Sequence, residues 1–475
     1  MEIKFRFYRI IQLYNRTMSW IANSFLELLK VLAEQNFPPT KTSHVLYIYS
    51  SLLYQSQKQC RFIRTLSPTA PLRPEPGWNT PNHLNMTLLY TSQWAFNKIN
   101  QVLFNSLAVR LSSFAASLRN PQYRIFTEIH RSQFTLLNRF LLQLWTLLDE
   151  NGWKNSDTFD GSLPNGSLSI DPNSTLPDGL TDAWTPLTSQ TYLSPGWGEI
   201  SGPVPSSVVD TYKNELNDFW NMITDRTNEY ADVLRISQNL TDEQKVISEF
   251  WAGGPGSVTP PGIWNLFLIG YLQQNRVNLQ STVRLFYAMN SALYQAGIIA
   301  WWAKRDKMQA RPIQKVRELF TNDVVESSYQ GTTTGSLWKP FQKNSFLTPP
   351  FPDFISGHST FSSAAATILY ELIGKNPNEM KCKLTPEMLN LISPIFSNRC
   401  VSYAVDIHCI PVYPETMEAE ATSPSKLIHL VSNTWDDLAL MAGVSRIYGG
   451  IHIESSNYPG YVIGKEIGHY ISQNI

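Results

Sequence analysis

Residues 352–362 read PDFISGHSTFS, and they place a serine, a glycine and a histidine directly before an alanine-rich stretch that favours helix. Ser356, Gly357 and His358 are therefore predicted at a helix N-terminus, where free backbone N–H groups and the helix dipole attract anions. The absence of a side chain at Gly357 lets an anion approach the backbone closely. The alternative is plain N-capping by Ser356 or Ser359, with His358 in solvent.

A second stretch, WWAKRDKMQARP at residues 301–312, closes a long segment with apolar residues at helical spacing. Lys304 and Arg311 lie seven residues apart, about two helical turns, so both side chains can face one direction. Pro312 disfavours helical geometry at Arg311 and places its guanidinium near the helix exit. The alternative is a charged helix end whose cations favour the negative end of the dipole.

A third stretch, SRIYGGIH at residues 445–452, follows another apolar-periodic segment. Gly449 and Gly450 allow a tight turn, which brings Arg446 and His452 over one site. In such a site a histidine can act as a ligand or a nucleophile. Without that context, a histidine after two glycines is an ordinary loop residue.

Together the three stretches offer cations, hydrogen-bond donors and imidazoles for a single site. Three buried cations would repel one another strongly at low dielectric unless an anion lay between them. The sequence therefore predicts a site for a multiply charged tetrahedral oxyanion, built from Lys304, Arg311, Arg446, Ser356, the Gly357 amide, His358 and His452.

Composition excludes several other classes of function. The 475 residues include 38 Lys plus Arg and 38 Asp plus Glu, so no net field favours nucleic acid or an acidic membrane. No apolar run reaches the length of a membrane span, which predicts a soluble protein rather than an integral membrane protein. Polar residues interrupt any signal-peptide core near the N-terminus, and the location stays open, including a secreted or vesicular one. The sequence is compatible with a homo-oligomer.

The periodicity predicts an all-α fold with long irregular inserts. Helical spacing dominates an N-terminal region, 1–207, which ends in a Gly-, Pro- and Ser-rich surface excursion at 149–207. Helical spacing resumes over 208–475, the region that carries the oxyanion site, and no strand-rich region is expected. A second irregular insert is expected at 376–425.

Four cysteines occur without any C-x-x-C pair, which argues against a zinc knuckle. A disulfide among the last three is compatible with the sequence, which does not select the pair: Cys382, Cys400 and Cys409.

The ordered motifs K-x6-R-P, S-G-H and S-R-x3-G-x-H resemble those of the vanadium-dependent haloperoxidases and their relatives, the type 2 phosphatidic acid phosphatases. The flanking segments 240–265 and 348–366, and a helical hairpin around Pro38 and Pro39, are similar to soluble haloperoxidase-like chains. The resemblance covers most of the sequence outside the irregular inserts. It implies two helical bundles, with orthovanadate bound in the second.

The resemblance also implies a role for each motif residue. His452 corresponds to the axial vanadium ligand and His358 to the acid–base group. The remaining residues would balance or hydrogen-bond the vanadate oxygens: Lys304, Arg311, Arg446, Ser356 and the Gly357 N–H. Lys304 would in addition polarise bound peroxide. Phe351 and Trp301 are similar to residues of fungal chloroperoxidase and indicate chloride competence, although packing is the alternative for both.

The implied activity is oxidation of a halide by hydrogen peroxide to hypohalous acid, which then reacts with a small organic acceptor. The alternative is a soluble acid-phosphatase-like phosphomonoesterase, in which His452 attacks the phosphate ester and His358 protonates the leaving oxygen. A non-catalytic relative is the third reading, but all seven site positions are present.

The chain departs from the family pattern at three places, one of which is the insert at 376–425, longer than the pattern predicts. After His452 the chain reads IESSNYPG, where soluble haloperoxidases usually have an aromatic residue and an Arg-Phe-Asp-like stretch. Ile355 stands where many relatives have proline before S-G-H. The departure after His452 raises the question of what supports the axial histidine.

Overall fold

The computed structural model describes residues 20–63, 80–104, 109–118, 131–158, 162–374, 382–393, 400–403, 406–409, 428–430, 432 and 434–475. Helices dominate these residues, so the all-α prediction is confirmed. After a helix at 20–34 come α2 (Pro39–Ile63), α3 (Thr80–Leu103), α4 (Val109–Ser117), α6 (Arg131–Asp149), α7 (Ser206–Met222), α8 (Thr227–Gln238), α9 (Asp242–Phe250), α10 (Thr259–Gln274), α11 (Leu279–Lys307), α12 (Pro312–Leu319), α13 (Gly357–Leu372), α14 (Pro386–Ile392), α15 (Trp435–Tyr448) and α16 (Glu454–Asn474).

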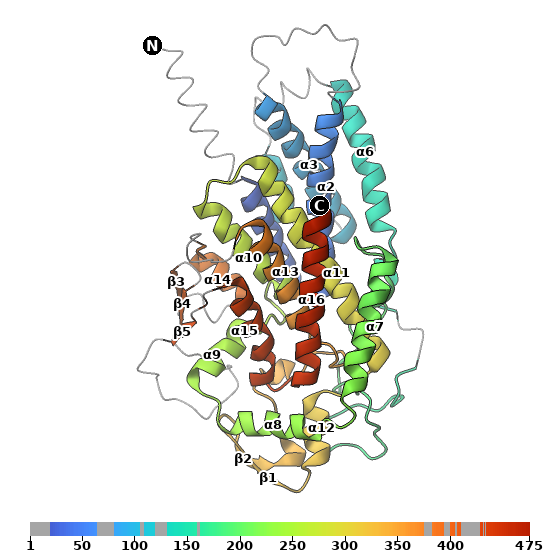
Figure 1. Cartoon of the computed structure of the whole chain (residues 1–475), viewed down its shortest axis with the longest axis vertical. Coiled ribbons are helices and arrows are strands. Elements are labelled where there is room, and N and C mark those ends of the chain that lie inside the picture. The colour runs from blue at the N-terminus through green and yellow to red at the C-terminus, as the bar shows by residue number, and fades with distance from the viewer. Residues whose placement is uncertain are drawn as a thin grey trace.

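The long helix α11 joins two helical bundles. It contacts α2 of the N-terminal helices and also α13, which in turn packs on α15 and α16. Figure 1 shows α11, α13 and α16 running through the middle of the molecule, with α2, α3 and α6 towards one end. The candidate site residues at the ends of these helices are buried, apart from half-buried His358. The domain boundary at residue 207 stays a prediction.

Side chains that cap helix N-termini explain where several helices begin. Thr241 and Gln244 form a reciprocal capping box at the start of α9. Thr434 and Asp437 form a second box at α15. Ser356 accepts a hydrogen bond from the Ser359 amide at the start of α13, so the N-capping interpretation of Ser356 is confirmed.

Three glycines at four-residue spacing allow α16 to pack closely on α13. A Cβ at Gly460 would lie 2.8 Å from the Ser356 carbonyl oxygen, and one at Gly468 would lie 2.8 Å from the Ala364 carbonyl oxygen. At Gly464 a Cβ would overlap the Thr360 carbonyl oxygen and the Ser363 hydroxyl. The backbones thus touch where any side chain would separate them, which fixes the N-terminus of α13 against the first turns of α16.

The segment 149–207 is irregular as predicted, but the prediction that it lies only on the surface is wrong. Beyond two short 3-10 helices, η1 (Trp153–Asn155) and η2 (Trp197–Glu199), it buries the side chains of Ile170, Trp184 and Trp197. Its backbone also forms a hydrogen bond with the segment between Lys304 and Arg311: the Trp184 amide donates to the Met308 carbonyl at 2.7 Å. Large aromatic side chains let a Gly- and Pro-rich segment contribute to the core.

The described residues contain no strand-rich region, as predicted, although two small antiparallel sheets occur among them. The first pairs β1 (Val324–Ser327) with β2 (Gly331–Thr334) beside the 3-10 helix η3 (Gly335–Leu337). A further 3-10 helix, η4 (Asn344–Phe346), follows it. The second sheet has the order β3 (Cys400–Tyr403), β4 (Asp406–Cys409), β5 (Ile428–Leu430). Four-residue strands are too short for a period-2 pattern to stand out in the sequence.

The insert predicted at 376–425 is only partly described. It contains α14 as well as β3 and β4, so it is not wholly irregular. Cys382 is buried and unpaired, whereas the side chains of Cys60, Cys400 and Cys409 lie outside the described residues. A disulfide within the insert therefore stays a prediction.

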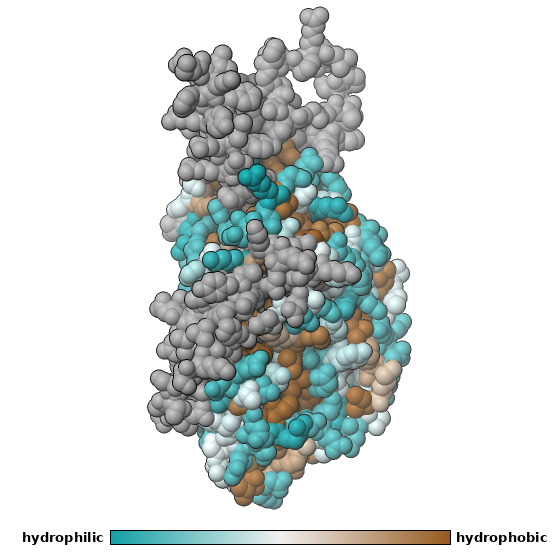
Figure 2. All heavy atoms as spheres, turned by 60° about the vertical axis from the view of Figure 1, so that its left-hand side comes forward, coloured by the Kyte–Doolittle hydropathy of each residue, from teal (hydrophilic) through white to brown (hydrophobic). Residues whose placement is uncertain are grey.

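Hydrophobic and hydrophilic residues are interspersed on the face of the molecule shown in Figure 2. No helix within the described residues is long and apolar enough to cross a bilayer.

His44 is a fully buried histidine that predicts a pH-dependent stability. Its ring lies 5.1 Å from the rings of Trp153 and Tyr294, and neither ring nitrogen has a hydrogen-bond partner among the described residues. Burial lowers the pKa of His44 to about 3. Because this pKa lies below the unfolded value, the unfolded chain binds the proton first, and stability is lost as pH falls below about 6.5.

Between pH 7 and pH 5 we expect His44 to lower the free energy of unfolding by about 2 kcal/mol. His44→Leu should remove this contribution, so the melting temperature of the variant should fall less than that of the parent over the same pH range. Parallel thermal scans at several pH values measure the difference. Identical pH dependence in the two proteins would contradict the buried neutral state of His44.

Candidate functional site

The structure places the seven predicted site residues at the ends of five helices. Lys304 lies in the last turn of α11 and Arg311 is the N-cap of α12. Ser356 is the N-cap of α13, which begins with Gly357 and His358. Arg446 lies in the last turn of α15, and His452 directly precedes Ile453, the N-cap of α16.

Lys304 and Arg311 do not lie two turns apart on one helix, as their seven-residue spacing suggested. Helix α11 ends at Lys307, and Arg311 has an extended backbone with φ −75° and ψ 155°. Pro312 at the first position of α12 imposes this conformation, as expected for a residue before proline. The two cations approach one another through the turn between α11 and α12, not along one helix.

The Arg311 guanidinium is buried, and one of its three nitrogens is without a hydrogen-bond partner among the described residues. Its Nε donates to the Phe351 carbonyl at 2.8 Å and its Nη1 donates to the Ile451 carbonyl at 2.8 Å. Nη2 has no hydrogen-bond partner among the described residues. Burial lowers the pKa of Arg311 to about 10, which still leaves the group charged at neutral pH. A buried, charged, unpaired donor is costly, and an anion beside it would remove that cost.

Lys304 is fully buried and donates to three backbone carbonyls of one loop. Its Nζ lies 3.0 Å from the oxygen of Pro352, 2.9 Å from that of Asp353 and 2.6 Å from that of Ile355. These bonds use all three donors of an ammonium group. Burial first, and then Arg311, hold the pKa of Lys304 well below its usual value. Lys304 therefore fixes the loop before α13, and its contact with a bound oxyanion stays a prediction.

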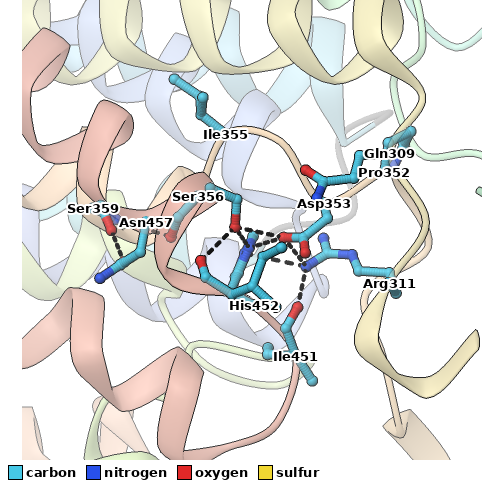
Figure 3. Close-up of polar contacts among 12 residues, drawn as sticks. Gln309, Arg311, Pro352, Asp353, Ile355, Ser356, Ser359, Ile451, His452 and Asn457 are labelled. Carbon is cyan, nitrogen blue, oxygen red and sulfur yellow. Dashed lines mark hydrogen bonds and ion pairs between the residues drawn. The ribbon is translucent and has the colours of Figure 1, made fainter. Parts of the chain in front are cut away.

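His452 is held from both sides of its ring, as Figure 3 shows. Its Nε2 lies 3.1 Å from Arg311 Nη1, and its Nδ1 lies 3.1 Å from Ser456 Oγ and in closer contact with Asp353 Oδ1. A guanidinium only donates, so Nε2 must accept and the proton must lie on Nδ1. Burial, followed by Arg311, Lys304 and Arg446, lowers the pKa of His452, which keeps the ring neutral.

Asp353 is a site residue that the sequence interpretation missed. Its carboxylate is fully buried between Arg311 and His452 (Figure 3). Its Oδ1 accepts a hydrogen bond from Ser456 Oγ at 2.9 Å. Burial raises the pKa of Asp353 to about 6, against the opposing effect of Arg311 and Lys304. The one available signal was a lone acidic residue within the apolar stretch PPFPDFI.

His358 is half-buried and has a defined tautomer. Its Nε2 lies 2.7 Å from the Trp251 carbonyl oxygen, and because a carbonyl only accepts, Nε2 carries the proton. Nδ1 is left with a lone pair. Burial, followed by Arg446 and His452, lowers the pKa of His358 well below its usual value. A neutral imidazole with a free lone pair can accept a proton.

Arg446 links the site to helix α9. Its Nε donates to Ser445 Oγ at 2.9 Å and its Nη2 donates to the Ser248 carbonyl. Burial lowers the pKa of Arg446 to about 9, while nearby Glu249 acts in the opposite direction. Burial in turn raises the pKa of Glu249 to about 7.

The electrostatic couplings show that the cations and imidazoles gather at one place. Beyond the effect of burial, the pKa of His452 is lowered by the charges of Arg311, Lys304 and Arg446. Beyond the same effect, the pKa of His358 is lowered by Arg446, His452 and Lys304. Two buried carboxylates, Asp353 and Glu249, partly compensate the three cations, which leaves an excess of one positive charge when both carboxylates are ionised.

Comparison with known proteins agrees with this fold. Residues 284–475, which contain all seven predicted site residues, match the family model of the VCPO second helical-bundle domain. A bacterial vanadium-dependent iodoperoxidase structure aligns with a TM-score of 0.60 and 16% identity over 96% of this chain and 95% of that one. The chain has the vanadium haloperoxidase fold. The holo form of a bacterial vanadium-dependent chloroperoxidase aligns with a TM-score of 0.58 and 15% identity over 92% of each chain. No curated protein matches the sequence significantly.

Within this haloperoxidase fold, the aromatic pair singled out for halide choice lies against the cations. The Phe351 ring centroid is 5.1 Å from Lys304 Nζ and 5.0 Å from Arg311 Cζ, and 4.9 Å from the Trp301 ring. Trp301 Nε1 donates to the Leu193 carbonyl at 3.0 Å. Cation–π contacts account for the packing of Phe351 between the cations, and a role in halide choice stays a prediction.

Proposed function

We propose that this chain is a vanadate-dependent haloperoxidase, which uses hydrogen peroxide to oxidise a halide to hypohalous acid for reaction with a small organic acceptor. The observation that carries the proposal is the free Nη2 donor of buried Arg311 beside His452, whose Nε2 bears a lone pair. A tetrahedral oxyanion whose central atom accepts an imidazole ligand matches both groups.

The residues present fit orthovanadate. His452 would hold the metal through Nε2, because its proton lies on Nδ1. Arg311 and Arg446 would balance the negative oxygens, and the Gly357 N–H at the start of α13 would donate to them. Ser356 accepts from the Ser359 amide as a cap, which leaves its hydroxyl hydrogen for an oxyanion. When bound, vanadate supplies a Lewis acid that activates peroxide towards halide.

The other groups of the site hold and move protons. His358 can take a proton at Nδ1, because its Nε2–H is committed to the Trp251 carbonyl. Lys304 contributes positive charge while it keeps the loop before α13 in place. The similarity to chloro- and iodoperoxidase structures over more than nine-tenths of each chain favours peroxidase over phosphatase chemistry.

The proposal is tested by assaying purified protein with and without orthovanadate. Peroxide-dependent halogenation of an organic acceptor is measured with chloride, bromide and iodide in turn, and hydrolysis of a phosphate monoester is measured in parallel. We expect halogenation only after orthovanadate is added, with inorganic phosphate competing for the site. Hydrolysis that orthovanadate inhibits, without halogenation, would instead assign the same residues to a phosphatase. If the protein showed neither halogenation nor hydrolysis, the proposal would be overturned.

A further inference from the structure

The imidazole of His452 takes its orientation from a residue outside its own segment. Its Nδ1 contacts Asp353 Oδ1 on the loop before α13, and Ser456 Oγ lies 3.1 Å from Nδ1 and donates to the same carboxylate oxygen at 2.9 Å. Asp353 and Ser456 thus converge on one ring nitrogen from two segments about one hundred residues apart. On the opposite edge of the ring, Nε2 faces Arg311.

We infer that Asp353 is the positioning residue of His452: its carboxylate holds the proton on Nδ1 and so presents the Nε2 lone pair to an oxyanion. A hydroxyl alone does not select a tautomer, because it can donate or accept. A carboxylate accepts the Nδ1–H and fixes both ring orientation and tautomer, the arrangement that metal-binding histidines generally use. The role in oxyanion binding rests on the proposed function, whereas the tautomer does not.

The loop that carries Asp353 is itself held rigidly. Lys304 Nζ binds the carbonyl oxygens of residues 352, 353 and 355, and the Asp353 amide donates to the Gln309 carbonyl at 2.9 Å. The Ser356 amide, three residues on, donates to the Ser456 carbonyl at 2.8 Å. With its backbone tied on both sides, Asp353 has little freedom to leave His452, which is what a positioning role requires.

Removing Asp353 should change oxyanion affinity in opposite directions, depending on whether Asp353 acts only through its charge or by positioning His452. If Asp353 acted only as a negative charge near an anion site, removing it would strengthen oxyanion binding. If it orients His452, removing it releases the ring and weakens binding. The sign of the change in affinity therefore separates the two.

The experiment uses three test variants of the full chain and a fourth for signal assignment. Asp353→Ala removes the hydrogen-bond acceptor. Asp353→Asn removes the charge but keeps the side-chain shape, and it replaces the alanine variant if that variant folds poorly. Asp353→Ala combined with Ser456→Asp returns a carboxylate to Nδ1 from the α16 side. Nitrogen-15 NMR of histidine-labelled protein without oxyanion reports the His452 tautomer, with signals assigned through His452→Gln. Equilibrium dialysis measures orthovanadate affinity, and circular dichroism checks the fold.

We expect the parent to carry the proton on Nδ1. In Asp353→Ala the ring is released from its place beside Arg311, so that neither contact selects a tautomer, and we expect a mixture of tautomers with orthovanadate affinity about 10- to 100-fold lower. The double variant should recover both the single tautomer and the affinity. Asp353→Asn, whose side-chain carbonyl can still accept, should fall in between. An unchanged tautomer, or tighter orthovanadate binding in Asp353→Ala and Asp353→Asn, would overturn the inference. A parent that binds no orthovanadate would overturn the proposed function instead, and the tautomers would still decide the role of Asp353.

Discussion

His452→Ala should lower the affinity for orthovanadate by at least about 100-fold and abolish halogenation, because it removes the only protein group proposed to bond the metal directly. The structure gives His452 a lone pair on Nε2 beside Arg311, and Lys304 and Arg446 are close enough to lower the pKa of the ring. The three cations are proposed to attract the oxyanion. With the imidazole gone, these cations retain only a weak, general attraction for anions. Equilibrium dialysis with orthovanadate measures the loss.

His358→Ala should have a different effect, since His358 is proposed to move a proton and not to bond the metal. Its Nε2–H is committed to the Trp251 carbonyl, and only Nδ1 is available. We expect orthovanadate affinity close to that of the parent and turnover lower by about 100-fold or more. Binding and turnover must be measured on the same preparations, so that loss of metal is not mistaken for loss of proton transfer.

His469→Ala is the matched control for both substitutions. His469 lies on α16, pairs with Glu371 and is half-exposed, so its loss should change neither orthovanadate binding nor turnover. Equal orthovanadate affinity in the parent, His452→Ala and His358→Ala would contradict the ligand assignment. A loss of binding in His358→Ala as large as that in His452→Ala would show that the two histidines do not have separate roles.

Local signals in the sequence are strong where the structure depends on neighbouring residues. Apolar spacing and an alanine-rich run predict a helix over 359–372, which the structure extends to Gly357–Leu372. The proline after Arg311 correctly predicts a non-helical backbone at that arginine. The two-bundle fold came from the resemblance of the ordered motifs, because periodicity alone does not say which helices pack together.

Features that depend on distant residues were not visible in the sequence. Asp353 meets His452 only because α13 and α16 lie side by side, and nothing in the local pattern around either residue encodes that contact. Trp184, within the segment 149–207, is likewise buried beside a distant part of the chain. Its backbone amide donates a hydrogen bond to the carbonyl of Met308, more than one hundred residues away. Composition predicted an exposed excursion because glycine and proline exclude regular structure, but they do not exclude burial.

Gly464→Ala should destabilise the protein by about 2 kcal/mol, despite replacing glycine with the best helix former. The added methyl group would overlap the Thr360 carbonyl oxygen and the Ser363 hydroxyl of α13. A backbone carbonyl inside a helix cannot rotate away, so α16 must move, and this cost exceeds the gain of about 1 kcal/mol in helix propensity. Chemical denaturation compared with the parent measures the difference.

The same substitution should weaken orthovanadate binding, because α13 carries Ser356 and Gly357 at its N-terminus while the first turn of α16 follows His452. Displacing one helix from the other moves these donors away from the imidazole. Gly254→Ala is the control, since Gly254 lies outside the left-handed backbone region and a Cβ there would meet only Phe346 Cδ1 at 3.9 Å. We expect that variant to match the parent in stability and binding. If Gly464→Ala were as stable as the parent, the close contact of α13 and α16 could not be what holds the two halves of the site together.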